Sequence, residues 1–233
     1  MIIETLLNTL FPAFCVGCGK EGKYVCEKCY VFVGESALIC PRCDESSFSG
    51  ERHSQCTTSY GLDGLANVWE YEGIAKKVLG TIKYGGITHA VGELVQSSFQ
   101  LMIADKARFG AFLQFLLGSR QAITYVPMFL QKEKKRGFNQ AKLIAQVVGK
   151  ITGRKVLQLL TKIKDTSSQT ELDKKERAEN VKDSFAVLHT GGTLSVVLVD
   201  DIWTTGATMK ECCRALKRAG AKEVWGFTLS RTP

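Results

Sequence analysis

Two adjacent acids, Asp200 and Asp201, separate an apolar run from a turn rich in hydroxyl groups. The apolar run at residues 196–199 predicts a strand covered on both faces of a parallel sheet, and the spacing over residues 207–219 predicts a helix. The turn at 204–208 therefore lies at a helix N-terminus, which favours a phosphate. Carboxylates at the carboxyl end of the strand can hold sugar hydroxyls, directly or through Mg²⁺. The stretch predicts a site for a phosphorylated sugar.

The turn offers several kinds of phosphate contact. A glycine lets the backbone approach the ligand closely, free N–H groups can point at it, and threonine hydroxyls can donate to its oxygens. The residues expected to bind the phosphate are Thr204, Thr205, Gly206, Ala207 and Thr208. The alternative is structural, with an acid pair that ends a strand and a Thr-Thr-Gly that caps a helix. The chain has no Gly-x-x-x-x-Gly-Lys-Ser/Thr and no Gly-x-Gly-x-x-Gly after a strand, so ATPase and nicotinamide functions have no motif behind them.

The stretch from Val196 to Thr208 resembles the phosphoribosyl-pyrophosphate (PRPP) motif of type I phosphoribosyltransferases. The resemblance implies an α/β fold, a mainly parallel sheet flanked by helices. It also implies that Asp200 and Asp201 are the catalytic pair, which holds the ribose and Mg²⁺, and that the turn holds the 5′-phosphate.

Two basic segments upstream are candidate contacts for the rest of the ligand. Lys83 ends a predicted helix, just before Gly85. Residues 131–140 predict a basic loop that leads from a strand into a helix over residues 141–150, which again makes an anion site. In a phosphoribosyltransferase, Arg136 and Lys83 would hold the leaving pyrophosphate. A charged run exposed to water before a helix would look the same.

A polar segment at residues 162–180 predicts a lid, because segments of this length in α/β domains often close over a site. We expect it to cover a labile sugar cation and to exclude water. Its candidate residues are Ser168, Gln169 and Arg177. The alternative is a plain surface loop followed by a helix over residues 173–180.

The cysteines predict two closed metal sites in the first quarter of the chain. Four thiols occur as two Cys-x-x-Cys knuckles, and a tetrahedral Zn²⁺ takes four such ligands. A second set has a histidine in place of one thiol, and its spacing repeats that of the other knuckles. The two ligand sets are Cys15, Cys18, Cys26 and Cys29, and Cys40, Cys43, His53 and Cys56. Closed sites leave no open position for catalysis, so we expect two structural zinc ions.

Composition and cysteine usage indicate which partners and which cellular compartment suit the protein. A formal charge of +8 favours anionic partners such as polyphosphates or nucleic acid. No apolar run approaches the roughly 20 residues that span a bilayer, so we expect no stable membrane insertion. Cys-x-x-Cys pairs without a signal peptide argue for the cytoplasm. The cysteine spacing divides the chain into an N-terminal helix and double zinc ribbon at residues 1–60 and a phosphoribosyltransferase-like domain at residues 61–233.

Taken in order along the chain, these motifs resemble the ComF/GntX-type competence family. The stretch Arg136-Gly137-Phe138-Asn139-Gln140 is the strongest mark of the resemblance. It implies a double zinc ribbon on a type I phosphoribosyltransferase domain and a role in DNA uptake during natural competence. His53 departs from the family pattern, which has a cysteine at that place.

Two functions are consistent with these features. The first is a phosphoribosyltransferase that binds Mg²⁺-PRPP and transfers the ribose to an unknown acceptor. The second is a non-catalytic module that binds PRPP or single-stranded DNA and works with proteins of the competence machinery. No residue declares itself as a general base, and Thr204 stands where hypoxanthine-type enzymes carry an acid.

Overall fold

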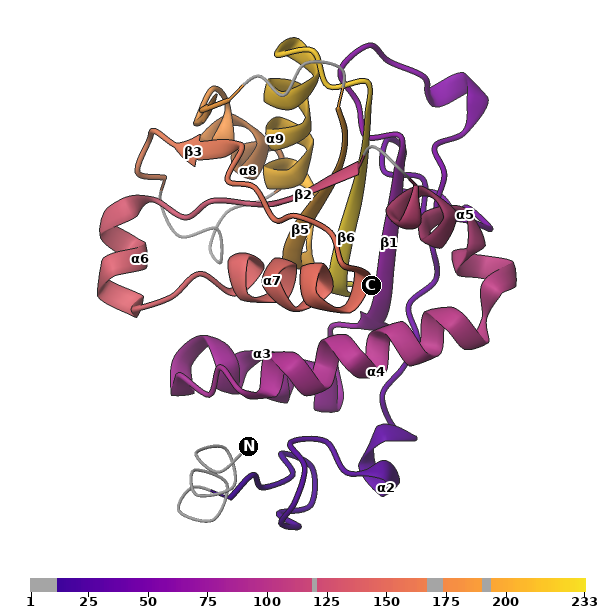
Figure 1. Ribbon diagram of the computed structural model, residues 1–233, viewed down its shortest axis with the longest axis vertical. Coiled ribbons are helices and arrows are strands. Elements are labelled where there is room, and N and C mark those ends of the chain that lie inside the picture. The colour runs from indigo at the N-terminus through magenta and orange to yellow at the C-terminus, as the bar shows by residue number, and fades with distance from the viewer. Residues whose placement is uncertain (1–11, 119–120, 167–173, 190–193) are drawn as a thin grey trace.

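The structure is a computed structural model of the 233-residue chain (Figure 1). It describes residues 12–118, 121–166, 174–189 and 194–233. Its central sheet has the order β1-β6-β5-β2, with β1 (Gly64–Glu70), β2 (Gln121–Tyr125), β5 (Ser195–Trp203) and β6 (Glu223–Arg231). The longer helices are α3 (Gly73–Gly85), α4 (Ala90–Ala104), α5 (Lys106–Leu117), α7 (Gln140–Thr152) and α9 (Ala207–Arg218).

All neighbouring pairs in this sheet are parallel, as the sequence predicts. Residues 196–199 of β5 are all buried, because α7 and α9 both pack on the strand. An apolar run of this kind has no polar face to show to water. The predicted α/β fold, with helices flanking a parallel sheet, is therefore confirmed.

A second, small sheet pairs β3 (Leu160–Lys162) with β4 (Phe185–Val187) in antiparallel fashion. Between these strands the chain forms α8 (Lys174–Val181), which packs against α9. The helix expected under the surface-loop alternative is thus present, nearly at its predicted position.

The predicted basic loop at residues 131–140 is wrong over most of its length, because the chain there forms α6 (Leu130–Arg136). Lys, Arg, Gln and Glu are good helix formers, and the three basic residues of its last turn suit the negative end of the helix dipole. The helix ends at Gly137. The next helix begins after Asn139, whose Oδ1 accepts the Lys142 N–H at 3.2 Å.

The later part of the cysteine-rich segment lies along β1 and extends that edge of the sheet, whereas its first part, with α2, lies beyond α4 (Figure 1). Isolated antiparallel bridges join Glu35 to Trp69 and Glu51 to Gly64. The segment also contains α2 (Glu27–Tyr30) and a 3₁₀ turn at Ser54–Cys56. Covering the edge removes unpaired backbone groups that could recruit another strand.

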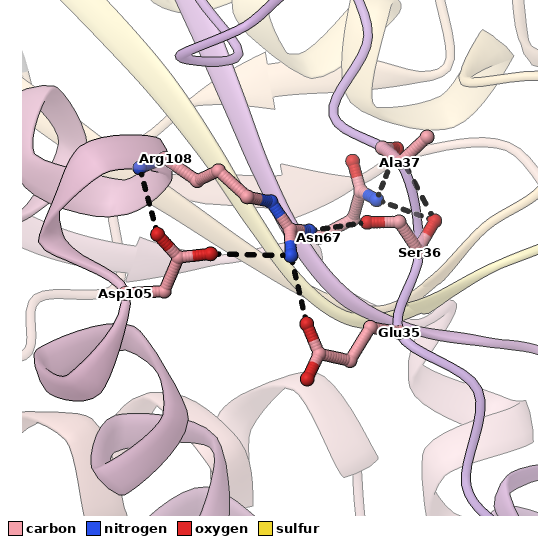
Figure 2. Close-up of polar contacts among 6 residues, drawn as sticks. All are labelled: Glu35, Ser36, Ala37, Asn67, Asp105 and Arg108. Atoms are coloured by element: carbon pink, nitrogen blue, oxygen red, sulfur yellow. Dashed lines mark hydrogen bonds and ion pairs between the residues drawn. The ribbon is translucent and has the colours of Figure 1, made fainter.

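Polar contacts fix this segment to the body at two places. The Glu93 carboxylate on α4 accepts the N–H groups of Tyr24 and Val25 at 3.0 and 2.8 Å. Between the two cysteine clusters, the Arg108 guanidinium of α5 donates to Glu35 Oε2 at 2.7 Å and to the Ser36 carbonyl at 2.8 Å (Figure 2).

The same linker is also bound to the sheet. Asn67 Nδ2 of β1 donates to Ser36 Oγ at 2.7 Å and to the Ala37 carbonyl at 3.1 Å (Figure 2). One hydrophobic cluster contains Cys15, Leu38 and the β1 residue Leu65. The cysteine-rich segment therefore shares its core with the α/β body, and the boundary near residue 60 stays a prediction. No helix among the described residues is both long enough and apolar enough to cross a membrane.

Candidate functional site

The turn between β5 and α9 contains a glycine that packs directly against a tryptophan ring. Gly206, the N-cap of α9, has φ +71°. A Cβ at this position would lie 2.1 Å from Trp203 Cζ2, and the Trp203 side chain is buried. Only glycine satisfies both the left-handed backbone and the close approach. The strand end and the helix N-terminus are thereby brought together, as the sequence predicts.

Within the turn, the threonines differ in their surroundings. Thr204 is exposed, whereas Thr205 is partly buried and its Oγ1 accepts the Ala207 N–H at 3.4 Å. Ala207 and Thr208 belong to the first turn of α9. N–H groups in a first helical turn have no preceding helical carbonyl to donate to, so the turn suits an anion.

The acid pair lies near the end of β5, two residues before this turn. Asp201 N–H donates to Asp200 Oδ1 at 2.9 Å, and Ile202 N–H donates to Asp201 Oδ1 at 2.9 Å. Burial, followed by the neighbouring Asp201 carboxylate, raises the pKa of Asp200 well above its usual range. Two adjacent carboxyls in such a place favour a bound cation or hydroxyl donors, because both stabilise the charged form against the repulsion.

Two lysines act on Asp200. The Lys83 ammonium, in the last turn of α3, opposes the rise in the Asp200 pKa. Lys162, at the end of β3, has a pKa lowered by burial and by Lys132, and the Asp200 carboxylate acts against this lowering. Lys162 Nζ also donates to Thr166 Oγ1 at 2.7 Å. A region with two cations beside two acids can bind a polyphosphate together with its metal.

Two tyrosines add to the surroundings of the acid pair. The pKa of Tyr71 is raised by burial and then by the charges of Asp201 and Tyr84. Lys83 Nζ lies 5.5 Å from the centre of the Tyr84 ring, which is itself exposed. Residues from α3 and the end of β1 therefore meet the end of β5.

Arg136 lies in a different environment. Its guanidinium donates to Gln140 Oε1 at 3.0 Å and approaches Met128 Sδ at 3.7 Å, and its described contacts do not reach the acid pair. Asn139 caps α7 and donates through Nδ2 to the Val126 carbonyl at 3.1 Å. The Arg-Gly-Phe-Asn-Gln stretch thus forms the short connection between α6 and α7. Hydrogen bonds from its own side chains stabilise this connection. The pyrophosphate role of Arg136 stays a prediction.

Two of the three predicted flap residues, Ser168 and Gln169, lie outside the described residues. Arg177 belongs to α8, and its side chain lies outside the described part of the chain. The closing role of this segment stays a prediction.

The predicted ligand atoms of each cysteine cluster converge, and within each set they all lie within 4.8 Å of one another. Tetrahedral Zn²⁺ with bonds of about 2.3 Å places its sulfur ligands about 3.8 Å apart, so both sets fit the ion. The first set is packed closely, since a Cβ on Gly17 would lie 2.7 Å from Cys29 Sγ. Both predicted ligand sets are therefore compatible with zinc.

His53 has the geometry of a metal ligand. Its Nδ1 lies 3.5 Å from Cys43 Sγ, and its Nε2 lies 3.0 Å from the Ser46 carbonyl oxygen. Donation from Nε2–H to that carbonyl leaves Nδ1 unprotonated and aimed at the cluster, which is the usual outer-shell arrangement of a zinc-bound histidine.

The two clusters share a backbone feature that favours thiolates. The N–H of the third ligand donates to the sulfur of the first at 3.4 Å, from Cys26 to Cys15 and from His53 to Cys40. Burial opposes ionisation, but backbone hydrogen bonds outweigh it and lower the pKa of Cys15 to about 6 and that of Cys40 to about 7. Thiolates are the form that binds metal.

Three contributors to the site escaped the sequence analysis, namely Trp203, Lys162 and Lys210. Trp203 supports Gly206, and Lys162 acts on Asp200 from a different sheet. Lys210 donates to the Thr205 carbonyl at 3.5 Å and to Asp44 Oδ1 at 3.3 Å. The sequence places a tryptophan directly before Thr-Thr-Gly and a lysine one helical turn after it. These positions could have identified Trp203 and Lys210.

Comparison with known proteins agrees with this arrangement. Residues 134–230 match the phosphoribosyl transferase domain. The DNA utilization protein YhgH of Salmonella typhi is 25% identical over 219 residues, which cover 94% of this chain and 88% of that protein. Competence protein F of Haemophilus influenzae is 32% identical over 113 residues, 46% of this chain and 49% of that protein. Competence protein ComFC of Bacillus subtilis is 28% identical over 170 residues, 71% of this chain and 63% of that protein.

The chain is similar to ComF-type competence and DNA utilization proteins. The resemblance to the ComF/GntX-type family and the phosphoribosyltransferase fold are thus confirmed. The matched domain includes β5, the acid pair, the turn and α9. The cysteine clusters lie before it, in the part of the chain that the longer match to YhgH also covers.

The raised pKa of Asp200 predicts that its charge destabilises the ligand-free fold. As the pH rises above the ordinary carboxyl range, the unfolded chain releases this proton before the folded one does, so stability falls. Asp200→Asn keeps an oxygen for the Asp201 N–H and removes the charge. We expect its melting temperature to exceed that of the wild type at about pH 8, with the difference shrinking toward about pH 5. Thermal unfolding of the zinc-loaded protein in a buffer free of Mg²⁺ and phosphorylated ligands checks this, and a variant less stable than wild type at the higher pH would contradict it.

The cluster geometry predicts about two zinc ions per chain. His53→Ala should reduce the content to about one, because the second set then lacks its fourth ligand. His189→Ala, which changes an exposed histidine outside both clusters, is the matched control and should retain both ions. Metal analysis of purified protein measures this, and an unchanged content in His53→Ala would remove His53 from the ligand set.

Proposed function

We propose that this chain binds Mg²⁺-PRPP and acts as a phosphoribosyltransferase in the use of external DNA. The observation that carries the proposal is the meeting of the acid pair, the Gly206 turn and the two lysines at the end of β5. Each part suits one part of PRPP. The carboxylates suit the ribose hydroxyls, the turn suits the 5′-phosphate, and the cations suit the pyrophosphate.

The acid pair also fits the metal. Mg²⁺ usually keeps several waters and takes one or two carboxylates together with phosphate oxygens of the substrate, and Asp200 and Asp201 offer two carboxylates. When bound, Mg²⁺ would neutralise part of the pyrophosphate charge. The raised pKa of Asp200 supports this role, because a site that holds a carboxylate poorly alone gains most from a cation.

The chemistry asked of the protein is mainly positioning. In phosphoribosyl transfer the bond from ribose C1 to pyrophosphate breaks, and an acceptor atom bonds to C1. Lys83 and Lys162 would stabilise the charge that develops on the leaving group, and Arg136 would join them if the α6–α7 corner approaches the ligand. The segment with Ser168, Gln169 and Arg177 would exclude water from the sugar cation. No described residue is placed as a base for the acceptor, so we propose an acceptor that is nucleophilic by itself.

The setting follows from the homologues. Competence protein F and ComFC are named for competence, and YhgH is named for DNA utilization. We extend that setting to this chain, acting in the cytoplasm with proteins of the competence machinery. Zinc in the two cysteine clusters would supply folding free energy to a segment with few large apolar residues.

A second candidate function is a non-catalytic module that binds PRPP or single-stranded DNA. Exposed aromatic rings in the cysteine-rich segment favour it, because bases stack on such rings. Phe14, Phe32 and Phe48 are 53%, 77% and 74% exposed. The net charge of +8 would draw the nucleic-acid backbone to the same protein.

The proposal predicts that Asp201→Asn weakens Mg²⁺-PRPP by at least about tenfold, or roughly 1.4 kcal/mol, because the grip on metal and ribose loses one charge. The asparagine can still accept the Ile202 N–H, so the strand end should keep its shape. Binding of ribose 5-phosphate without Mg²⁺ should hold or tighten. Calorimetric titration of both ligands checks this, and equal loss of both would show that the substitution damaged the whole site.

The turn offers the complementary pair of variants. Thr205→Val should weaken any 5′-phosphorylated ligand with or without Mg²⁺, and Thr205→Ser, which keeps the hydroxyl, is the control. DNA uptake in a host that carries Asp201→Asn then tests whether PRPP is the working ligand. Normal uptake by a variant shown to have lost PRPP binding would leave only a module that binds single-stranded DNA.

A further inference from the structure

Lys210 joins the phosphate turn to the second cysteine cluster. It stands in the first turn of α9, where its N–H donates to the Gly206 carbonyl at 2.8 Å. Its ammonium lies 5.2 Å from the centre of the Trp203 ring and 3.5 Å from the Thr205 carbonyl oxygen. The same ammonium is 3.3 Å from Asp44 Oδ1. One side chain therefore contacts the support of the turn, the turn itself and the cysteine-rich segment.

The turn is sensitive to the position of Lys210. Gly206 already lies against the Trp203 ring, so a shift of the indole moves the backbone that would hold a phosphate. The Lys210 ammonium stabilises the ring through a cation–π contact and the turn through its carbonyl. Its side chain is 32% exposed and that of Asp44 is 27% exposed, so the pair is screened less than a fully exposed one.

Asp44 in turn depends on the second cluster. It directly follows Cys43, and it has φ +65°, a conformation that few residues other than glycine adopt. Its N–H donates to the Cys40 carbonyl at 3.0 Å, which closes the knuckle of the cluster. Asp44 thus directly follows a predicted metal ligand. A metal ion that orders the loop between Cys40 and Cys43 would also fix the position of the Asp44 side chain.

The two elements face each other across a groove of 490 Å³. One wall carries Pro41, Arg42 and Cys56 of the cluster, and the other carries Ala207 and Lys210 of α9. The Lys210–Asp44 pair links the two walls directly.

We propose that Lys210 is a positioning residue that couples metal at the Cys40–Cys43–His53–Cys56 cluster to a phosphate at the turn, each stabilising the other. The proposal rests on the phosphate role of the turn given under the proposed function. Coupling of this kind is reciprocal in affinity, so phosphate should raise the affinity for metal by the same factor as metal raises that for phosphate, and slower metal loss is the expected sign of it. The ligand class is a phosphate monoester on a sugar, and the metal is a tetrahedral ion such as Zn²⁺.

The test measures zinc release from the zinc-loaded full-length chain to a chromophoric chelator, with and without saturating ribose 5-phosphate. In the wild type, ribose 5-phosphate should slow release from the second cluster by about fivefold, at the low end of usual coupling. The phase that belongs to this cluster is the one missing in His53→Ala.

Lys210→Met keeps an apolar chain over Trp203 and removes the ammonium, and it should reduce the effect to less than about twofold. Asp44→Asn, a change outside α9, should do the same. Lys23→Met is the matched control, because it removes an exposed lysine beside the first cluster. The Lys23 ammonium lies 3.2 Å from Glu27 Oε1. It should behave as the wild type.

Undiminished slowing in both Lys210→Met and Asp44→Asn would overturn the coupling. Wild-type protein that binds ribose 5-phosphate by calorimetry without any change in zinc release would overturn it as well, and would leave the proposed function intact. Absence of ribose 5-phosphate binding to the wild type would refute the phosphate turn itself, and the coupling with it.

Discussion

The contact between Gly206 and the Trp203 ring is the constraint on which the candidate site depends. It accompanies a left-handed glycine three residues after the end of β5, and α9 starts at the next residue. The helix N-terminus and the Asp200–Asp201 pair therefore face the same region, although one favours anions and the other favours cations. A ligand that carries a phosphate for the helix N-terminus and a metal-bound polyphosphate for the acid pair satisfies both preferences. Any larger residue at this glycine would separate the two halves of the site.

The site is also assembled from distant parts of the chain. Lys83 comes from α3, Lys162 from β3 and Lys210 from α9, and all three are close enough to act on β5 or its turn. The charged acid pair is energetically unfavourable without a bound cation or hydroxyl donor, as the raised pKa of Asp200 indicates. Such a stored repulsion is released when a cation or hydroxyl donor binds, so the instability of the empty site supports affinity for the ligand.

The sequence was sufficient for features that depend on local order. Residues 196–208 contain strand, acids, glycine and helix start in succession, and both metal sets follow from knuckle spacing. It was insufficient where tertiary packing decides. The charged run before Arg136 was interpreted as a loop, although its residues are good helix formers and form α6. The pairs Lys210–Asp44 and Arg108–Glu35 join residues far apart in the chain, and no spacing rule predicts such partners.

The central claim is that the site holds PRPP as a whole, beyond a bare phosphate. Calorimetric titration of the wild type with PRPP and with ribose 5-phosphate, both with Mg²⁺, tests it directly. The account predicts that PRPP binds at least about tenfold more tightly, because only PRPP engages the turn, the acid pair and the lysines together. Equal affinity of the two ligands in the presence of Mg²⁺ would contradict it and reduce the site to a phosphate-binding turn.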